Sequence, residues 1–243
     1  MTLRLHEGAG NWFVVLTQVL LLMLLSLSNI PHGFALGMSA AGALALLGWS
    51  AASRRARLVA DTASSKIDTA AQGYVELAGV AEPLPGELLR DPATGGPCVW
   101  YQVETHANRG AGWVIERTVR SNAPIGLRDE TGVCLILPKG AELRIAREEQ
   151  VTQSATRTHR VQRIVAGDRL YAIGQFETRA RAVVGQSARP EHVLRAPDDG
   201  RPFVLSDRPA RRLADLYREW AKAHAVVAFV GLAVAILLAL TAL

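Results

Sequence analysis

The chain has 243 residues, of which 49% are hydrophobic and 20% are charged, and it carries a formal net charge of +5. Nearly all the charge is central, because 26 of the 27 basic residues lie between Ser53 and Lys222. The two cysteines and six scattered histidines lack the paired spacing of zinc sites, which excludes a zinc ribbon and a disulfide-framed domain.

Two uncharged apolar runs begin the chain, at about residues 11–29 and 34–52. A helix needs about 20 apolar residues to cross a bilayer, and both runs have that length. The four residues IPHG between the runs contain a proline and a glycine, which favour a tight turn. Residues 1–52 are therefore predicted to form a transmembrane helical hairpin.

Small residues recur at every fourth position of the second run, at Gly37, Ala41 and Ala45. This spacing lets another helix approach closely, and it is one way for the hairpin to pack. An alternative interpretation makes the first run a cleaved signal peptide that has Arg4 in its charged leading region.

Residues 53–72 contain neither glycine nor proline and are predicted to continue the second helix as a stalk. The periodicity then changes, and residues 73–206 are predicted to form a β-rich domain. The segments 98–106 and 113–120 alternate apolar and polar residues and are joined by a glycine-containing loop, which indicates a β-hairpin. Residues 147–167 are polar and rich in Thr and Arg, so we expect an irregular loop there.

Residues 207–243 are predicted to form one long helix that begins near Pro209 and ends as a transmembrane span at about 223–243. The strands show no alternation with helices, so a parallel α/β fold is not expected. The predicted class is an α+β membrane protein whose β-rich domain, a small barrel or a sandwich, lies beside the membrane between helices.

Basic residues flank both predicted entries of the middle segment into the bilayer. This basic belt consists of Arg54, Arg55, Arg57, Arg211, Arg212, Arg218 and Lys222. The predicted interface aromatics are Trp12, Trp49, Tyr217 and Trp220. Cationic and aromatic residues of this kind gather at membrane interfaces, with the cations on the cytoplasmic side.

The expected location is therefore the bacterial inner membrane, with the β-rich domain in the cytoplasm. The abundance of arginine, alanine and glycine is typical of a GC-rich bacterial genome. The expected partners are the lipid bilayer, its anionic headgroups, and another membrane protein or a second copy of the chain.

No set of residues predicts catalysis. The segment ASSK at 63–66 offers a serine and a lysine, but it lies on the predicted stalk without glycines for an oxyanion site. Cys98 falls on a predicted strand without a partnered histidine, and both cysteines are expected to be reduced core residues. We therefore expect no catalytic residue, no cofactor and no bound metal.

Nucleic-acid binding by a small β-barrel is an alternative function. Trp100, Tyr101 and Trp113 could serve as stacking platforms beside a basic surface. Core packing on strand faces explains the same aromatics equally simply, so we expect no nucleic-acid partner.

Four segments resemble the GIDE family when they are taken in order along the chain. They are TASSKIDTAAQGYVELAGVAEPL at 62–84, GGPCVWYQVET at 95–105, RLYAIGQFE at 169–177 and RPFVLSDRPARRLADLYREW at 201–220. The resemblance implies a β-rich domain beside the membrane between transmembrane helices. In that family, which includes a mitochondrial ubiquitin ligase, a RING zinc domain follows the last helix.

This chain departs from the family pattern in two ways. It contains no Cys/His ligand pairs of a RING domain, so we do not expect ubiquitin-transfer activity. It also has an additional apolar run at its beginning, and the mitochondrial relative places its domain in the intermembrane space instead of the cytoplasm.

The function predicted from the sequence is a membrane-tethered interaction or scaffold module without intrinsic catalysis. A domain tethered at both ends would be concentrated near other membrane proteins. Two alternatives remain, which are RING-type ubiquitin-ligase activity, as the family resemblance suggests, and a nucleic-acid-binding barrel.

Overall fold

The computed structural model describes residues 18–20, 23, 33–86, 88–110, 112–145, 147–183 and 186–241. The chain divides into two compact units. The helical unit combines the two ends of the chain, Met1–Asp61 and Arg211–Leu243, and the β unit is Thr62–Ala210. The β unit is thus inserted between the two parts of one helical unit.

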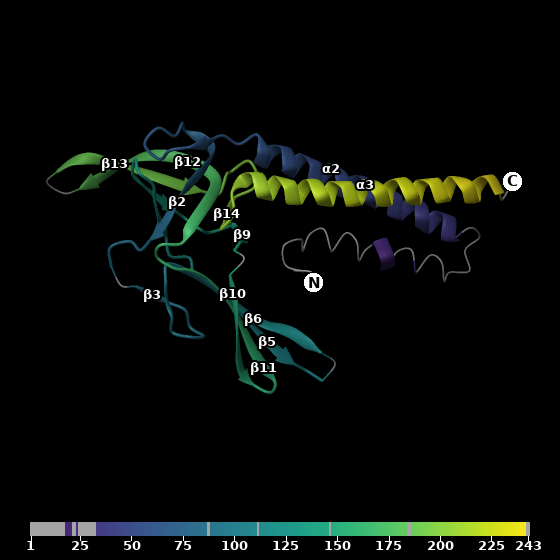
Figure 1. Ribbon diagram of the computed structural model, residues 1–243, viewed down its shortest axis with the longest axis horizontal. Helices are drawn as coiled ribbons and strands as arrows, with labels where there is room; N and C mark the ends of the chain where they lie inside the picture. The colour runs from purple at the N-terminus through teal and green to yellow at the C-terminus, as the bar shows by residue number, and fades with distance from the viewer. Residues whose placement is uncertain are drawn as a thin grey trace. The chain divides into compact units, whose positions relative to one another are not determined.

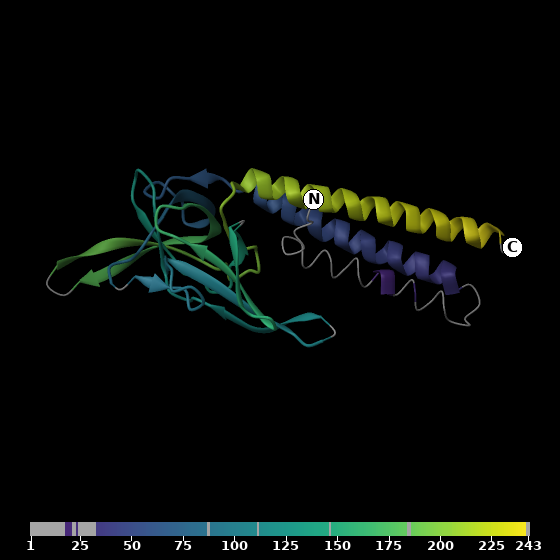
Figure 2. The same ribbon diagram turned by 60° about the horizontal axis from the view of Figure 1, so that its bottom comes forward.

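Two long helices, α2 (Gly33–Ala60) and α3 (Ala210–Thr241), lie side by side in the helical unit (Figure 1, Figure 2). They run antiparallel, because Gly42 faces Leu232 and Gly48 faces His224. A Cβ atom added at Gly48 would lie only 3.0–3.1 Å from three atoms of the His224 ring. Glycine therefore sets the close approach of the two helices.

The contact faces of both helices consist mainly of small residues. Those buried in α2 are Gly33, Gly37, Ala41, Gly42, Ala45, Gly48, Ala52, Ala56 and Val59. The buried stripe of α3 comprises Ala214, Tyr217, Ala221, His224, Ala228, Gly231 and Ala235. Its spacing alternates between three and four residues, which is the repeat of helix pairs with a left-handed supercoil.

The opposite faces of α2 and α3 expose large apolar side chains. Phe229 is 76% exposed and Leu47 is 67% exposed, and several leucines and valines around them are similarly exposed. By length and composition, each helix could cross a bilayer. The prediction of apolar helices at both ends of the chain is thus confirmed for α2 and α3.

Most of the first apolar run, 11–29, lies outside the described residues, and so does Trp12. Residues 18–20 and 23 of this run are helical. The Gln18 side chain donates a hydrogen bond to the Ala41 carbonyl oxygen at 3.3 Å, within the small-residue face of α2. The run therefore contacts α2 at this point.

Five strands of the β unit close into a barrel. In ring order they are β2 (Gly73–Glu82), β7 (Ile125–Arg128), β8 (Val133–Ile136), β13 (Gln186–Arg195) and β12 (Arg169–Val183), which pairs back to β2. The β8–β13 pairing is parallel and the other four are antiparallel. This Greek-key order, with the third strand beside the fifth, is that of the OB-fold barrel. Of the two predicted architectures, the barrel is the one found.

Strand β12 closes the barrel by bending between two neighbours. Its first half pairs with β2 and its second half with β13. Gly174 lies at the bend, where an added Cβ atom would lie 2.7 Å from the Phe203 ring and 2.8 Å from the Arg195 carbonyl oxygen. A residue without a side chain is therefore required at this corner of the barrel.

Short strands extend the barrel sheet on both sides. Strand β1 (Ser64–Ser65) pairs with β2, β14 (Val204–Ser206) pairs with β12, and β9 (Glu142–Arg144) pairs with β14. Both ends of the β unit meet at Glu76 of β2. Its backbone N–H donates to the Ala63 carbonyl oxygen at 3.0 Å, and its carboxylate accepts from the Ala210 N–H at 2.9 Å.

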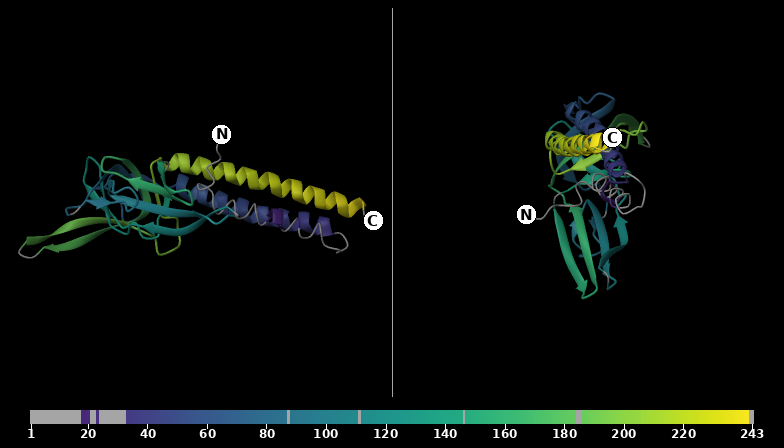
Figure 3. Two further views of the ribbon diagram at one scale, coloured as in Figure 1. Left: turned by 90° about the horizontal axis from the view of Figure 1, so that it is seen from below. Right: turned by 90° about the vertical axis from the view of Figure 1, so that its right-hand side faces the viewer.

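Two insertions into the barrel build a second, four-stranded sheet (Figure 3). Its strands, in spatial order, are β10 (Glu148–Ser154), β11 (Arg157–Ile164), β5 (Trp100–Asn108) and β6 (Trp113–Arg120). Strands β5 and β6 come from the β2–β7 connection, and β10 and β11 come from the β8–β12 connection. The first insertion also contains the short pair β3 (Leu89–Arg90) and β4 (Pro97–Cys98).

One hydrophobic core runs from the barrel into the base of the insertions. Leu77, Leu127 and Phe176 from the barrel belong to the same buried cluster as Trp100 of β5 and Ile164 of β11. The Trp100 indole is fully buried and donates its N–H to the Ser121 carbonyl oxygen at 2.9 Å. The second sheet is therefore anchored to the barrel at this tryptophan.

Two local predictions differ from the structure. The helix predicted to continue through 72 ends at Ala60, and the chain is already extended at β1. The segment 147–167, expected to be irregular, forms the β10–β11 hairpin instead. Strand β10 shows no burial alternation, because six of its seven residues are exposed and only Val151 is partly buried. The segment of β10 therefore lacks the alternation of apolar and polar residues from which a strand is predicted.

Asp91 joins the first insertion to β11. One carboxylate oxygen accepts hydrogen bonds from the Ala93 and Thr94 backbone N–H groups, and the other accepts from the Thr94 hydroxyl and from Arg163 at 3.1 Å. Burial raises the pKa of the Asp91 carboxyl, but the bonds from Thr94 and Ala93 and the Arg163 charge together lower this pKa below its ordinary value.

Replacing Gly48 by leucine should separate α2 from α3. The new side chain meets the His224 ring, and overpacking of this kind costs about 1–3 kcal/mol. We expect Gly48→Leu to lower the melting temperature of the detergent-solubilised full chain. Ala51→Leu, at an exposed position one turn away, should leave it nearly unchanged. Adding His224→Ala to Gly48→Leu should recover part of the loss, and equal destabilisation by both leucines would contradict this packing.

Acid should weaken the β unit partly through Asp91. Because the folded pKa is lowered, the charged form stabilises the fold above the unfolded pKa of about 3.9, and this contribution is lost as the pH falls through the folded value. Asp91→Asn should cost about 1–3 kcal/mol at neutral pH and flatten the acid limb of stability. Urea unfolding followed across pH measures both effects. The exposed Asp68→Asn serves as a control, and an unchanged acid limb in Asp91→Asn would refute the assignment.

Candidate functional site

The predicted basic belt lies at one end of the helix pair. Arg54, Arg55 and Arg57 are exposed near the end of α2, and Arg211 and Arg212 are exposed in the first turn of α3. The antiparallel packing brings these two groups to the same end. The remaining cations, Arg218 and Lys222, are exposed further along α3 and pair within the helix with Asp215 at 2.7 Å and Glu219 at 2.8 Å.

The predicted interface aromatics have different surroundings. Trp49 is 45% exposed on the outer face of α2, and Trp220 is partly buried with its ring centroid 6.2 Å from that of His224. Tyr217 is only 3% exposed, because it belongs to the buried stripe of α3. Its ring is therefore a packing element of the helix pair and does not face outward.

His224 was not among the predicted site residues. Its side chain is 1% exposed, and its Nε2 atom has no hydrogen-bond partner among the residues that the structure describes. The sequence signal was its position, as the single ionisable residue in the run 223–243. The ring fills the space left by Gly48, so its role in this structure is packing.

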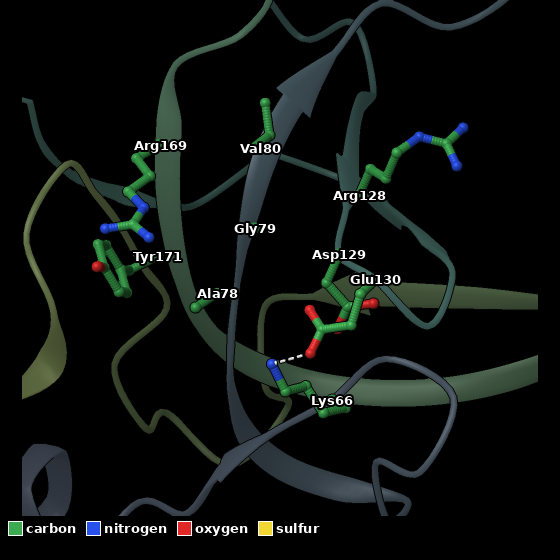
Figure 4. A pocket seen from close by; sticks show the side chains of 9 residues that line it. All are labelled: Lys66, Ala78, Gly79, Val80, Arg128, Asp129, Glu130, Arg169 and Tyr171. Atoms are coloured by element: carbon green, nitrogen blue, oxygen red, sulfur yellow. Dashed lines mark ion pairs between the residues drawn. The ribbon is translucent and has the colours of Figure 1, made fainter.

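A cleft of about 380 Å³ opens on the outer surface of the barrel (Figure 4). Its floor is the segment Ala78–Val80 of β2, and Arg169 and Tyr171 of β12 form one wall. Lys66 and Glu130 form the other wall, where their side chains make an ion pair. Arg128 borders the cleft but points its guanidinium away, toward Glu82 at 2.6 Å.

The ion pair across the cleft wall is exposed and adds little stability. Both side chains are more than half exposed, and pairs of this kind contribute about 0–1 kcal/mol. The hydrogen bond between them raises the pKa of Lys66 and lowers the pKa of Glu130. At neutral pH both side chains are charged. Because the pair is exposed and weak, a charged group of a bound molecule can replace either partner.

Asp129 shapes the turn that carries Glu130. Its carboxylate accepts hydrogen bonds from the backbone N–H groups of Ile67 at 2.9 Å, Thr131 at 2.7 Å and Gly132 at 3.0 Å. Burial raises the pKa of the Asp129 carboxyl. The hydrogen bonds from Thr131, Ile67 and Gly132 lower it by more than burial raises it, so the Asp129 pKa lies below its ordinary range. The carboxylate is fully used in holding the turn.

Among the described residues, Arg169 is the cation of the cleft that is not held in an ion pair, whereas Arg128 pairs with Glu82 and Lys66 pairs with Glu130. It is exposed at the start of β12 and forms no ion pair with any residue in the described ranges. No pattern in the sequence pointed to this site, because its residues come from separate segments that only the closed barrel brings together.

Metal-binding clusters and reactive thiols are two features that catalysis could use. No group of three or more His, Cys, Asp or Glu side chains among them could hold a metal ion. Cys98 and Cys134 are free thiols, as expected, and both are buried. Burial raises the pKa of Cys98, and it raises the pKa of Cys134 to about 12. Neither thiol is therefore an activated nucleophile.

The aromatics considered for nucleic-acid stacking do not form a common surface. Trp100 is fully buried and Tyr101 is partly buried, whereas Trp113 is 50% exposed. Trp113 lies on β6, outside the barrel. Trp100 cannot stack on a base, because the core encloses it.

Comparison of the chain with family models, with curated proteins and with solved structures finds no match.

The two cysteines should resist modification in the folded protein. Both are buried and their thiols are held in the protonated form, so maleimide at about pH 8 should label neither. Labelling should become complete after denaturation, and mass spectrometry of the intact chain counts the adducts. Rapid native labelling of either thiol would show that the core of the β unit is open at that position.

Proposed function

We propose that this protein is a membrane-tethered interaction module of the GIDE type. In this proposal α2 and α3 span the bilayer of a bacterial inner membrane and hold the β unit at the cytoplasmic surface. The family assignment rests on the four ordered sequence segments, on the position of the barrel between two apolar helices in the chain, and on the return of both ends of the β unit to Glu76.

The distribution of charge on the helix pair carries this proposal. One end of the pair bears exposed arginines from both helices. Exposed ion pairs continue along α3 as far as Lys222, and beyond them the outer face of α3 exposes large apolar side chains from Val226 onward. A pair of this kind fits a bilayer whose cytoplasmic leaflet attracts the cations. The β unit connects to the helices at that same basic end, at Asp61 and Arg211.

The barrel cleft is the proposed contact site for a protein partner. Arg169 and Lys66 can attract an acidic side chain, and Tyr171 and the exposed Val80 offer apolar contact beside them. The proposed partner is a neighbouring membrane protein or a second copy of this chain, with an acidic segment near the membrane surface. A tether at both ends would concentrate the cleft where such segments occur.

The OB-type barrel order favours nucleic-acid binding as a second candidate, because barrels of this order bind oligonucleotides on the face of their second and third strands. Here that face belongs to β7 and β8, which are only four residues long. Arg128 of β7 is already bonded to Glu82. The protein-partner function therefore agrees better with the charges of the barrel.

A photocrosslinking residue at Val80 tests the cleft in intact cells. We expect a discrete adduct with one membrane protein or with a second copy, because Val80 lies on the exposed floor of the cleft. Arg169→Glu should remove the adduct through charge reversal, and Arg147→Glu, at an exposed position outside the cleft, should leave it intact.

Sidedness is the accompanying control. A reporter that is active only in the periplasm should be silent when inserted at Ala155, in the turn between β10 and β11, and active when fused after Leu243. The opposite pattern would reject the cytoplasmic location. An adduct that persists in Arg169→Glu would reject the cleft as the contact site.

A further inference from the structure

The tip of the β5–β6 hairpin exposes apolar side chains on both faces of the strand. Trp113 is 50% exposed, Val114 46% and Ile115 53%, at the beginning of β6. Successive residues of a strand point to opposite faces, so Trp113 and Ile115 share one face and Val114 lies on the other. Hydrophobic surface on both faces of one tip is unusual on a soluble domain and marks a binding site.

Strand β6 is at the edge of its sheet. It pairs with β5 on one side, with Asn108 opposite Trp113 and Ala107 opposite Val114. No described strand pairs with its other side. The tip therefore projects, and the residues that the structure describes leave its apolar side chains uncovered.

Arginines surround this apolar tip. Arg109 precedes it in the hairpin loop, Arg157 lies two strands away, and Arg117 follows along β6. Glu116 accepts from Arg109 at 3.3 Å and from Arg157 at 3.1 Å. With Arg117, the tip therefore has three guanidinium charges and one carboxylate charge. The tip thus has a net positive charge and complements an anionic surface.

We propose that this tip, Arg109–Gly110 with Trp113–Ile115, inserts into the interfacial layer of an anionic lipid leaflet. Tryptophan prefers the membrane interface, arginine binds lipid phosphates, and valine and isoleucine enter the acyl boundary. A fluid bilayer covers both faces of the tip at once, whereas a protein groove or an added strand would leave side chains of one face exposed. The inference rests on the proposed function, because it requires the helices to hold the β unit at a bilayer.

The consequence for the β unit is a third point of attachment. The chain connections at Asp61 and Arg211 are the other two points, and an inserted tip would fix one orientation of the β unit at the membrane surface. The cleft of the barrel would then face neighbouring proteins at a constant angle. The inserted tip, and not the helices alone, would determine which surface the partner meets.

A fluorescent probe at position 114 of the full chain tests the insertion. The variant Val114→Cys is labelled with an environment-sensitive dye, which should not label the buried Cys98 and Cys134. The protein is reconstituted into nanodiscs of phosphatidylcholine, with and without phosphatidylglycerol. We expect a blue-shifted emission and strong quenching by lipids with a nitroxide on the acyl chain, both enhanced by phosphatidylglycerol.

Asn122→Cys provides the matched control, because Asn122 is exposed just beyond the opposite end of β6. Its dye should be quenched several-fold less by lipid nitroxide and should remain accessible to aqueous iodide. Replacing Trp113 and Ile115 with serine should abolish lipid quenching at position 114. Arg117→Gln should keep the lipid quenching at position 114 and should reduce only the enhancement of that quenching by phosphatidylglycerol. Circular dichroism checks that the variants are folded.

Four results would be distinguishable. Lipid quenching at 114 but not at 122 supports insertion. A probe at 114 that stays accessible to iodide, while protease protection shows both helices in the bilayer, overturns this inference and leaves the proposed function intact. A probe that is shielded without lipid quenching, in a manner that depends on protein concentration, also overturns it and identifies a second copy as the occupant. Helices that fail to insert would contradict the proposed function itself.

Discussion

The position of Glu76 is the constraint on which both units depend. Its backbone N–H donates to the Ala63 carbonyl oxygen at the entry to the β unit, and its carboxylate accepts from the Ala210 N–H at the exit. Ala63 and Ala210 are nearly 150 positions apart in the chain, and both contact this one residue of β2. A carboxylate at the first amide of α3 also favours the start of that helix, because helix amino ends are partly positive. With the ends of the β unit joined here, α2 and α3 can pack antiparallel, and the glycines and alanines of their contact faces allow a close approach.

Barrel closure then determines which surface residues meet. Strand β12 pairs with β2 and bends at Gly174 to pair with β13, and the cleft forms beside this closing pair. Arg169 and Lys66 are about 100 residues apart and lie on its opposite walls. The insertions that build the second sheet leave the barrel through the β2–β7 and β8–β12 connections. The β unit therefore presents two separate surfaces, one polar and recessed at the barrel cleft and one apolar and projecting at the β6 tip.

The sequence predicted the elements in which apolar residues recur with a regular spacing, and it failed where that spacing is absent, as in β10, whose one apolar residue is Val151. The apolar helices and the strands around Trp100 and Trp113 were predicted because hydrophobic residues recur with helical or strand spacing. The hairpin β10–β11 was missed because β10 is exposed on both faces, and the end of α2 at Ala60 has neither glycine nor proline to mark it. The residues of the basic belt are visible in the sequence as two short clusters, at 54–57 and at 211–222. The cleft could not be predicted, because strand order and register, which sequence spacing does not encode, bring its residues together.

The glycine and alanine face of α2 has a consequence for how the protein is made. Its partner α3 is synthesised about 150 residues later, which at about 5–20 residues per second is a delay on the order of ten seconds. During that time the ribosome produces the whole β unit, whose β2–β12 closure must itself wait for strands nearly a hundred residues apart. The bond from Gln18 to the Ala41 carbonyl oxygen is a contact that α2 can make before α3 exists. This early contact would cover part of the small-residue face of α2 until α3 is made and completes the helix pair.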